Sequence, residues 1–540
     1  IINNAATTMQ SNGGPIVFWA TSADGTGYVQ IYAGSTVNTV NGTTTRTATG
    51  GGAIIVGGGS ATSGGYPSGP VTANTSASPA FWSGASGSAG SITTYYSGGG
   101  AITIRAKQSN QNRAISFSYA TTMWANGGQI TLNGVNDSAT GTPPGIEVMD
   151  TAVATNASDF YSSSNASPAI SISASSTNGP AFESGQFANA ANKIYFQATG
   201  TGGITFTGTN GSTTLNRPEV GINGTNVLSV GPITINTSSV TAGAGGYFDS
   251  QLVSAGSSGP STIGYCAVAT CPLSQVTTTS ANITFNTNSQ RSYLTPVDNN
   301  INTKGVVTFT PSLSTGFLTS VPTQNDKISS DCTGLVIGKD QTTNTWPYTT
   351  TGAYSIAGPI TIYSGSASIT KDLISTGSGN GILVKATGDI TTSSGTSGSP
   401  ISLRTNGGPI TLWSDSDNSG AGAISLADYT NVNSANGTTG STSQTTAGGN
   451  ITIAGGLDSS SPADGIPDGY ARGNSTGNVD GVRIGTGTTA SAVFNNIISG
   501  TGSINIKGKS AYGRGTFVSA AVSMVAGGAI MIEGSSSGTT

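Results

Sequence analysis

The sequence has 540 residues, including 81 glycines and no histidine, and only 7% of its residues are charged, with a net charge of −4. Ordinary globular domains carry about 25% charged residues, and the lack of a basic stripe excludes nucleic-acid binding as an expected function. No run of about 18 apolar residues occurs, so no membrane-spanning helix is predicted. The chain is long for one compact domain but not for a solenoid, in which each repeat contacts only its neighbours.

A glycine-rich hexad recurs along the chain, and a typical copy reads GGAITI. The glycines allow a sharp bend, and the alternating residues after them indicate a short strand with one apolar face. A strand that buries only two apolar side chains is not stable alone, so we predict that these strands stack as the rungs of a parallel β-solenoid. The copies occupy residues 13–18, 51–56, 99–104, 127–132, 407–412, 448–453 and 527–532.

Further strand cores lie between the hexads, separated by polar Gly, Ser and Asn segments. Helical periodicity is absent, and the irregular spacing predicts rungs of two or three short strands with loop insertions, on the order of 20 residues per rung. These cores occupy residues 170–172, 194–196, 204–206, 233–235, 283–285, 306–309, 360–362, 382–384, 401–403 and 424–426.

The predicted organisation has three parts. Residues 1–240 form a β-helix repeat segment, and residues 241–355 form an irregular, loop-rich β-helix section that holds all three cysteines. A separate small domain is the alternative for this middle part. Residues 356–540 form β-helix again, and within them residues 407–534 repeat residues 13–134 at offsets between 394 and 402. We therefore expect the chain to be a segment of a longer repeat array.

Cys266 and Cys271 flank a short irregular loop, and Cys332 is left over. Three cysteines are too few for a disulfide framework. A C-x4-C pair without histidine or a second pair is a poor zinc signature. Cys266 and Cys271 could close a small disulfide in an oxidising compartment.

The sequence offers few candidates for catalysis. The densest acidic cluster contains Asp415 and Asp417, with Asp458, Asp464 and Asp468 further along. The cluster resembles half of a calcium loop, but the spaced carboxylates and final glutamate of the full pattern are missing. The favoured interpretation is a surface turn, and Asp-Gly pairs are ordinary turn formers. We therefore predict no catalytic residue, no metal site and no cofactor.

Tryptophan side chains are the candidates for contact with sugars. Trp19 and Trp413 occupy the same position in the two copies of the long repeat, and Trp82 lies in polar surroundings. Aromatic rings on a sheet face could stack on sugar rings. Packing against a neighbouring rung is the favoured alternative for Trp413, because it directly follows an apolar strand.

Four runs, TGLVIGK at 333–339, GPITIY at 358–363, ILVKATGDI at 382–390 and GGPITLWSDSD at 407–417, resemble filamentous-haemagglutinin-like surface proteins of bacteria. The resemblance is strongest over 333–456 and recurs in the first 134 residues. It implies a right-handed parallel β-helix that is secreted and displayed on the bacterial cell surface, where such proteins serve in adhesion and in building fibres.

The expected function is therefore that of a non-enzymatic extracellular structural or adhesive protein, a shaft or filament segment of a large repetitive surface adhesin. Its expected partners are neighbouring copies of the repeat or other subunits placed end to end, and cell-surface glycans. Two alternatives stay open. A carbohydrate-binding β-helix module would use the aromatic and acidic loops, and a polysaccharide-degrading β-helix enzyme would need a groove with converging carboxylates.

Overall fold

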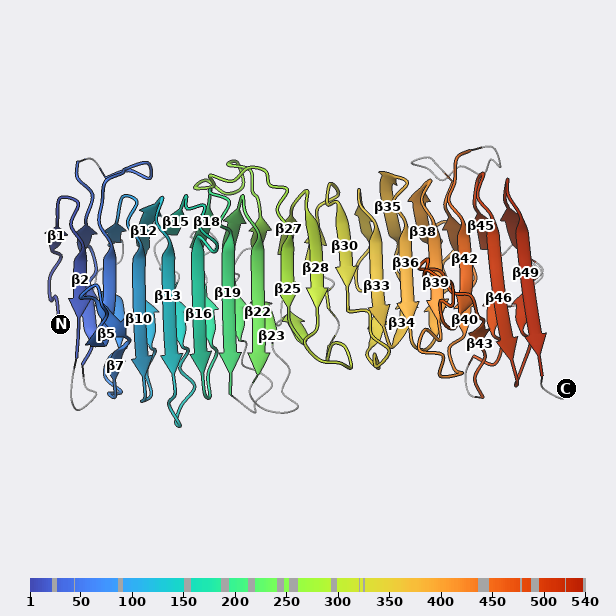
Figure 1. Ribbon diagram of the computed structural model, residues 1–540, viewed down its shortest axis with the longest axis horizontal. Coiled ribbons are helices and arrows are strands. Elements are labelled where there is room, and N and C mark those ends of the chain that lie inside the picture. Colours follow the sequence, from blue (N-terminus) through green and yellow to red (C-terminus); the bar gives the residue numbers. More distant parts are fainter. Residues whose placement is uncertain are drawn as a thin grey trace. The chain divides into compact units, whose positions relative to one another are not determined.

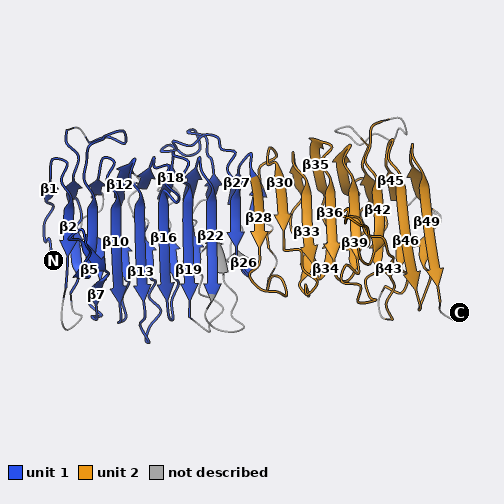
Figure 2. Ribbon diagram, viewed as in Figure 1, with its two compact units in different colours: residues 1–305, 325–327 blue, residues 306–324, 328–540 orange. Residues whose placement is uncertain are grey.

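The computed structural model shows an all-β protein, and no helix occurs in the part of the chain that it describes. Contacts between Cα atoms divide the chain into two compact units (Figure 2). Unit 1 comprises residues 1–305 and 325–327, and unit 2 comprises residues 306–324 and 328–540. The described residues are 1–21, 27–42, 44–85, 91–149, 157–185, 194–211, 219–239, 247–251, 261–292, 299–319, 321–323, 326–435, 446–475, 478–486, 495–519 and 521–537.

Unit 1 contains three parallel sheets, which we call the glycine-hexad sheet, the short-strand sheet and the clamp sheet (Figure 1). The glycine-hexad sheet contains β2 (Ile16–Trp19), β5 (Ile54–Ala61), β7 (Val71–Ala73), β10 (Ile102–Gln108), β13 (Ile130–Asn136), β16 (Ile170–Ser176), β19 (Ile204–Asn210), β22 (Ile233–Ser239) and β25 (Ile283–Asn286), with the hairpin strand β6 (Pro67–Gly69). The short-strand sheet contains β3 (Val29–Tyr32), β8 (Phe81–Ala85), β11 (Ile115–Phe117), β14 (Ile146–Val148), β17 (Phe182–Ser184), β20 (Val220–Ile222), β23 (Tyr247–Gln251) and β26 (Ser289–Ser292). The clamp sheet contains β1 (Thr8–Gln10), β4 (Thr36–Asn38), β9 (Thr93–Tyr96), β12 (Thr121–Asn126), β15 (Ser158–Ser162), β18 (Ile194–Ala198), β21 (Thr225–Ser229), β24 (Thr262–Gly264), β27 (Asn299–Asn302) and β29 (Asp326–Ile328).

Unit 2 also contains three parallel sheets. Its glycine-hexad sheet contains β28 (Val306–Thr310), β30 (Gly334–Ile337), β33 (Ile360–Ser364), β36 (Ile382–Ala386), β39 (Ile410–Ser414), β42 (Ile451–Gly455), β43 (Ala471–Arg472), β46 (Ile504–Ser510) and β49 (Ile530–Ser536). The second sheet contains β31 (Pro347–Thr349), β34 (Ser366–Ile369), β37 (Ile390–Thr392), β40 (Ile424–Leu426), β44 (Val482–Ile484) and β47 (Thr516–Val518). The third contains β32 (Tyr354–Ile356), β35 (Leu373–Ser378), β38 (Ile401–Asn406), β41 (Thr430–Asn433), β45 (Asn495–Ile498) and β48 (Val522–Val525).

In much of each unit, consecutive strands visit the three sheets in turn, so that a strand pairs with the one three positions along the chain. Additional strands such as β6, β7 and β43 change this spacing, so that β3 pairs with β8 and β40 with β44. In unit 1, β10 pairs in parallel with β13, β11 with β14, and β12 with β15. In unit 2, β33 pairs with β36, β34 with β37, and β35 with β38. We call one such set of three strands a triplet. The parallel stacking that the sequence predicts is therefore present in both units.

Triplets differ in length because their loops differ. In unit 2, 22 residues separate Ile360 from its register partner Ile382, whereas in unit 1, 50 residues separate Ile233 from Ile283. The expectation of about 20 residues per rung is therefore too low, since extra residues are accommodated in loops between strands. Residues 241–355 supply strands to both units, including β25 and β30.

The second glycine of the hexad is required by close stacking of neighbouring strands. A Cβ atom added to Gly52 would clash with the backbone of Gly14, and one added to Gly449 would clash with the backbone of Gly408. Only a residue without a side chain permits this approach. The second glycine of the hexad therefore marks the point where the backbones of two neighbouring triplets come closest.

Apolar side chains from the three sheets of unit 1 form its core. Along the glycine-hexad sheet, Ile54, Ile102 and Ile130 are register partners and are fully buried. Phenylalanines of the other sheets stack in the same interior, and the rings of Phe160 and Phe196 lie 4.7 Å apart. Each strand inside a sheet thus buries side chains against both of its neighbours, which supplies the stabilisation that an isolated strand lacks.

The two copies of the long repeat have the same pairing order. In unit 1, β2, β5, β10 and β13 are consecutive neighbours, and in unit 2, β39, β42, β46 and β49 are their counterparts. The second half of β5 forms an antiparallel hairpin with β6, where Gly58 pairs with Gly69, and Gly455 at the end of β42 pairs in the same way with Gly469. The repeat detected in the sequence is therefore also a structural repeat.

Candidate functional site

A groove of about 430 Å³ lies on the outer face of the glycine-hexad sheet of unit 2. Its volume falls within the range of about 300–1,000 Å³ that small-molecule sites occupy. A row of register partners on β33, β36, β39 and β42 forms its floor: Thr361, Leu383, Thr411 and Thr452. These residues alternate with buried isoleucines along each strand, so strand geometry directs them outward.

One wall of the groove belongs to the loop over residues 456–470, which we call the hairpin loop. Asp464, Gly465 and Ile466 line the groove from this loop. Asp458 fixes the loop from within, because its carboxylate accepts hydrogen bonds from the backbone N–H groups of Ser460 at 3.2 Å and Gly465 at 2.7 Å. The wall is thus held in place without a ligand.

Asp468 closes the base of the hairpin loop. Its Oδ2 accepts hydrogen bonds from the N–H of Ser459 at 2.8 Å and from its hydroxyl at 2.9 Å. These hydrogen bonds from Ser459 lower the pKa of the exposed Asp468 carboxyl. Asp458 and Asp468 therefore organise the loop, and of the three aspartates only Asp464 lines the groove.

Trp413 anchors the hairpin loop and is only 5% exposed. Its indole Nε1 donates a hydrogen bond to the carbonyl oxygen of Gly456 at 2.6 Å, and the ammonium of Lys385 lies 4.2 Å from its ring centre. In unit 1, the indole of Trp19 donates to Gly59 at 3.1 Å, at the matching place in the repeat. The tryptophan at this position therefore makes an anchoring hydrogen bond in both copies of the repeat. Lys385 covers one face of the Trp413 ring, so that face is not free to stack on a sugar.

Asp415 begins the turn that follows β39, as the sequence predicts, but its side chain is buried and not exposed at the surface. It is fully buried, its Oδ2 lies 3.3 Å from Nε of Arg472, and its Oδ1 accepts a hydrogen bond from the N–H of Gly420 at 2.9 Å. Burial raises the pKa of this carboxyl. The expected surface position is therefore wrong for Asp415, because the hairpin after β42 brings Arg472 onto it. No cluster of three or more potential metal-ligating side chains occurs among the described residues.

A second polar network lies on the outer face of the clamp sheet in unit 1. Oδ2 of the buried Asp159 receives hydrogen bonds from Arg46 Nη2 at 2.6 Å and from the indole of Trp124 at 2.7 Å. Its Oδ1 accepts one from Gln197 at 2.7 Å. The Arg46 guanidinium also lies 5.4 Å from the ring centres of both Trp124 and Tyr161. This arrangement fastens the loop that carries Arg46 across three strands.

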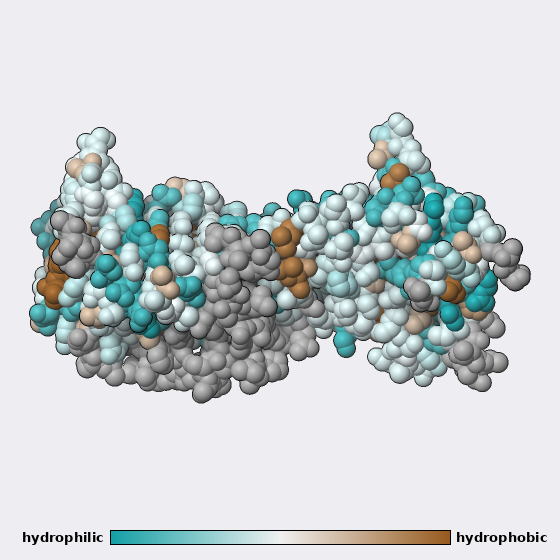
Figure 3. Space-filling model, turned by 90° about the horizontal axis from the view of Figure 1, so that it is seen from below, coloured by the Kyte–Doolittle hydropathy of each residue, from teal (hydrophilic) through white to brown (hydrophobic). Residues whose placement is uncertain are grey.

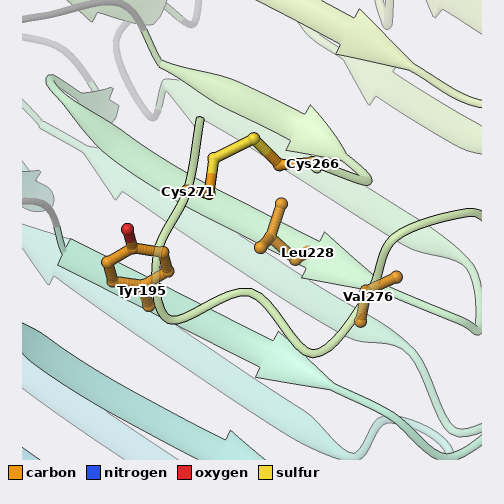
Figure 4. Close-up of a cluster of buried hydrophobic side chains, with 5 residues drawn as sticks. All are labelled: Tyr195, Leu228, Cys266, Cys271 and Val276. Carbon is orange, nitrogen blue, oxygen red and sulfur yellow. A yellow bond between two sulfur atoms is a disulfide. The ribbon is translucent and has the colours of Figure 1, made fainter. Parts of the chain in front are cut away.

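A loop closed by a disulfide between Cys266 and Cys271 covers the next part of the same face (Figure 4). The disulfide packs with Tyr195, Leu228 and Val276 in a small apolar cluster outside the main core. The backbone carbonyl of Leu273 in this loop accepts hydrogen bonds from Gln197 at 3.1 Å and from Arg46 at 3.4 Å. Cys332 lies outside the disulfide, its buried thiol donates a hydrogen bond to the carbonyl oxygen of Gly334 at 3.0 Å, and burial raises the pKa of this thiol.

Removing the disulfide is expected to destabilise unit 1 modestly. In the double variant Cys266→Ala/Cys271→Ala, the short closed loop gains freedom in the unfolded chain, which corresponds to about 2 kcal/mol. Denaturant unfolding monitored by fluorescence measures this change. The variant Cys332→Ala, which removes a thiol outside the disulfide, is the control. An unchanged unfolding midpoint for the double variant would show that the disulfide does not contribute to stability.

Trp82 lies on β8 of unit 1 and is half-buried. Its indole donates a hydrogen bond to the hydroxyl of Ser118 at 2.7 Å. Trp82 and Trp413 belong to different units, so neither unit alone brings these two candidate aromatics together.

Two glutamates of the short-strand sheet are register partners. Glu147 on β14 lies opposite Glu183 on β17, and both are buried. Arg113 reaches Glu147 at 2.8 Å, yet burial dominates and raises the pKa of this carboxyl. The pair was not recognised in the sequence, because 36 residues and a loop separate its members.

No family model, curated protein or solved structure matches the chain in the comparisons made with each of them. In the described part of the chain, no helix is long and apolar enough to cross a membrane.

Proposed function

We propose that each unit is a right-handed parallel β-helix and that the protein is a non-catalytic shaft or filament segment of a large bacterial surface adhesin. The handedness is supported by the general rule that crossovers between parallel strands are right-handed in about 98% of cases. An extracellular location is supported by the Cys266–Cys271 disulfide, because such bonds persist in oxidising compartments.

One observation carries this proposal: triplets of different length keep the same register. In unit 2, Ile360, Ile382, Ile410 and Ile451 follow one another as register partners along the glycine-hexad sheet, although their loops vary. Backbone hydrogen bonds and buried side chains therefore connect each triplet to the next. Such a column carries load along its length, which suits a structural role.

A largely uncharged surface suits a shaft that stands in solution. The face shown in Figure 3 is mainly hydrophilic or neutral, with small separate hydrophobic patches. With only 7% charged residues in the sequence, hydroxyl and amide groups supply most of the polarity. Solubility is then expected to depend little on salt.

The end strand β49 supports association with another copy of the repeat. Ile530 and Ile532 are 45% and 46% exposed. Their counterparts in the first copy, Ile130 and Leu132 on β13, are fully buried because β16 pairs with that strand. We therefore propose that a strand of a neighbouring repeat or subunit covers β49 as β16 covers β13.

Sedimentation velocity over a range of protein concentrations tests this end-to-end association. The purified chain is expected to associate reversibly, and Ile530→Lys/Ile532→Lys is expected to weaken association at least about tenfold, because lysine at a dry interface is costly. Met531→Lys is the matched control on the opposite face of the same strand. A chain that stays monomeric at all concentrations, or equal loss in both variants, would contradict the proposed stacking.

A further inference from the structure

We propose that the groove under the hairpin loop of unit 2 is a binding site for a neutral saccharide. The inference is independent of end-to-end stacking, because the groove lies on the outer face of the sheet and involves no residue of β49. It also differs from the sequence-based expectation, which placed sugar contacts at Trp82 and Trp413. The groove combines a volume of about 430 Å³ with threonine hydroxyls that have no hydrogen-bond partner among the described residues.

The lining has the mixed character that a sugar ring requires. Leu383, Pro359, Pro409 and Ile466 offer apolar surface for the C–H face of a pyranose ring. Ile466 is 36% exposed although it is apolar. Binding that covers such surface is favourable because it removes apolar area from water.

Hydroxyl groups face the same space. Thr361, Thr411 and Thr452 line the groove, and none of their hydroxyls hydrogen-bonds to another described residue. Asn450 adds an amide whose Oδ1 accepts a hydrogen bond from Ser503 N–H at 2.9 Å, which orients the side chain. A ligand rich in hydroxyls can both donate to and accept from such groups.

The charge of the lining favours a neutral ligand over an acidic one. Asp464 is the one carboxylate among the described lining residues, and they include no lysine or arginine. Lys385, on a strand of the floor, is 2.9 Å from Asp340 and covers Trp413, so its charge is already paired. An anionic polysaccharide would meet repulsion from Asp464 without a compensating cation.

An extended peptide fits this floor less well. Strands β36 and β39 lie between β33 and β42 and pair on both sides, so their backbone groups are already hydrogen-bonded. Recognition of a peptide by strand addition needs a free sheet edge. A saccharide needs only side-chain partners, which the groove supplies.

The hairpin loop holds the site ready for its ligand. Trp413 fastens the start of the loop at Gly456, and Asp458 and Asp468 satisfy backbone N–H groups within it. A wall that is ordered before binding loses little conformational freedom when the ligand enters. The tryptophan shared by the two copies thus acts on the site indirectly, by positioning the loop.

Isothermal titration of the purified full chain tests the proposal. The probes are the neutral disaccharides cellobiose, maltose and lactose, with digalacturonate, glucosamine and a Gly-Ser peptide for comparison. At least one neutral disaccharide is expected to bind, with an affinity unchanged between low and physiological salt. Absence of binding by all three, or tighter binding of the anionic, cationic or peptide probe, would overturn the proposal.

Three variants locate the binding site. Thr411→Val removes one hydroxyl at constant shape and is expected to weaken binding about 3- to 10-fold. Ile466→Ser changes an exposed loop residue without touching the core and is expected to weaken binding by a similar factor. Thr308→Val, on the outward-facing position of β28 in the same unit, is the control. Unchanged affinity in both groove variants, with circular dichroism confirming the fold, would place any binding elsewhere.

Discussion

Replacing Ile102 with aspartate is expected to unfold unit 1. Ile102 is fully buried on β10, between its register partners Ile54 and Ile130. A carboxylate there would lie among apolar side chains without a partner, at an expected cost of at least about 4 kcal/mol. Urea titration monitored by circular dichroism would show the loss, and protection of the unit 1 strands in hydrogen exchange would fall at the same time.

The control for this prediction is Thr103→Asp, one residue further along the same strand. Thr103 is only partly buried, and its register partners are Ile55 and Thr131 on the outer face. An exposed substitution of this kind typically changes the free energy of unfolding by less than about 1 kcal/mol. Equal destabilisation by the two variants would contradict the alternation of inner and outer faces, and with it the column of stacked triplets.

Removing Arg46 is expected to cause the second-largest decrease in the free energy of unfolding, after Ile102→Asp. Arg46→Met leaves the buried carboxylate of Asp159, to which Arg46 donates from Nε at 3.1 Å and Nη2 at 2.6 Å, without its cation. Breaking a buried pair costs about 3–5 kcal/mol because the remaining charge is uncompensated. We expect about 3 kcal/mol, since the Arg46 side chain is 18% exposed and water can partly replace it.

The pair Lys107–Asp137 of the same unit provides a matched comparison. Its atoms approach to 2.7 Å, but the side chains are 37% and 41% exposed. Lys107→Met is therefore expected to cost less than about 1 kcal/mol. A double-mutant cycle that combines Arg46→Met with Asp159→Asn, measured by denaturant unfolding, separates the pair's coupling from the loss of each side chain. A coupling no larger than that of a surface pair would show that the network does not hold the loop.

Local signals in the sequence were sufficient to predict the all-β class, the parallel stacking and the long repeat. The two glycines of each hexad mark the start of a strand, and the apolar alternation after them identifies the buried face. The pattern alone did not reveal why the second glycine is needed: a Cβ atom on Gly52 or Gly449 would clash with the backbone of the preceding copy's turn, about 40 residues earlier in the chain. The close spacing of Cys266 and Cys271 likewise allowed their pairing to be considered.

Contacts between side chains of distant strands were not predictable in this way. Arg46 and Asp159 are 113 residues apart, and Asp415 meets Arg472 only through the hairpin after β42. Loop lengths between strands vary, so residue spacing does not reveal which outward-facing side chains become neighbours. Asp415 is in a turn as predicted, but the expectation that it is exposed was wrong for this reason.

The sequence by itself determined which residues form strands and which of their faces is buried, because strand alternation and glycine-rich turns act within a few residues. Tertiary structure alone decided which loops cover the outer faces, how Trp413 anchors the hairpin loop, and where the groove lies. The groove exists because four strands from successive triplets align their outward-facing residues beneath a loop from the last of them. That alignment depends on the register of strands that are far apart in the chain, so it cannot be predicted from any short stretch of the sequence.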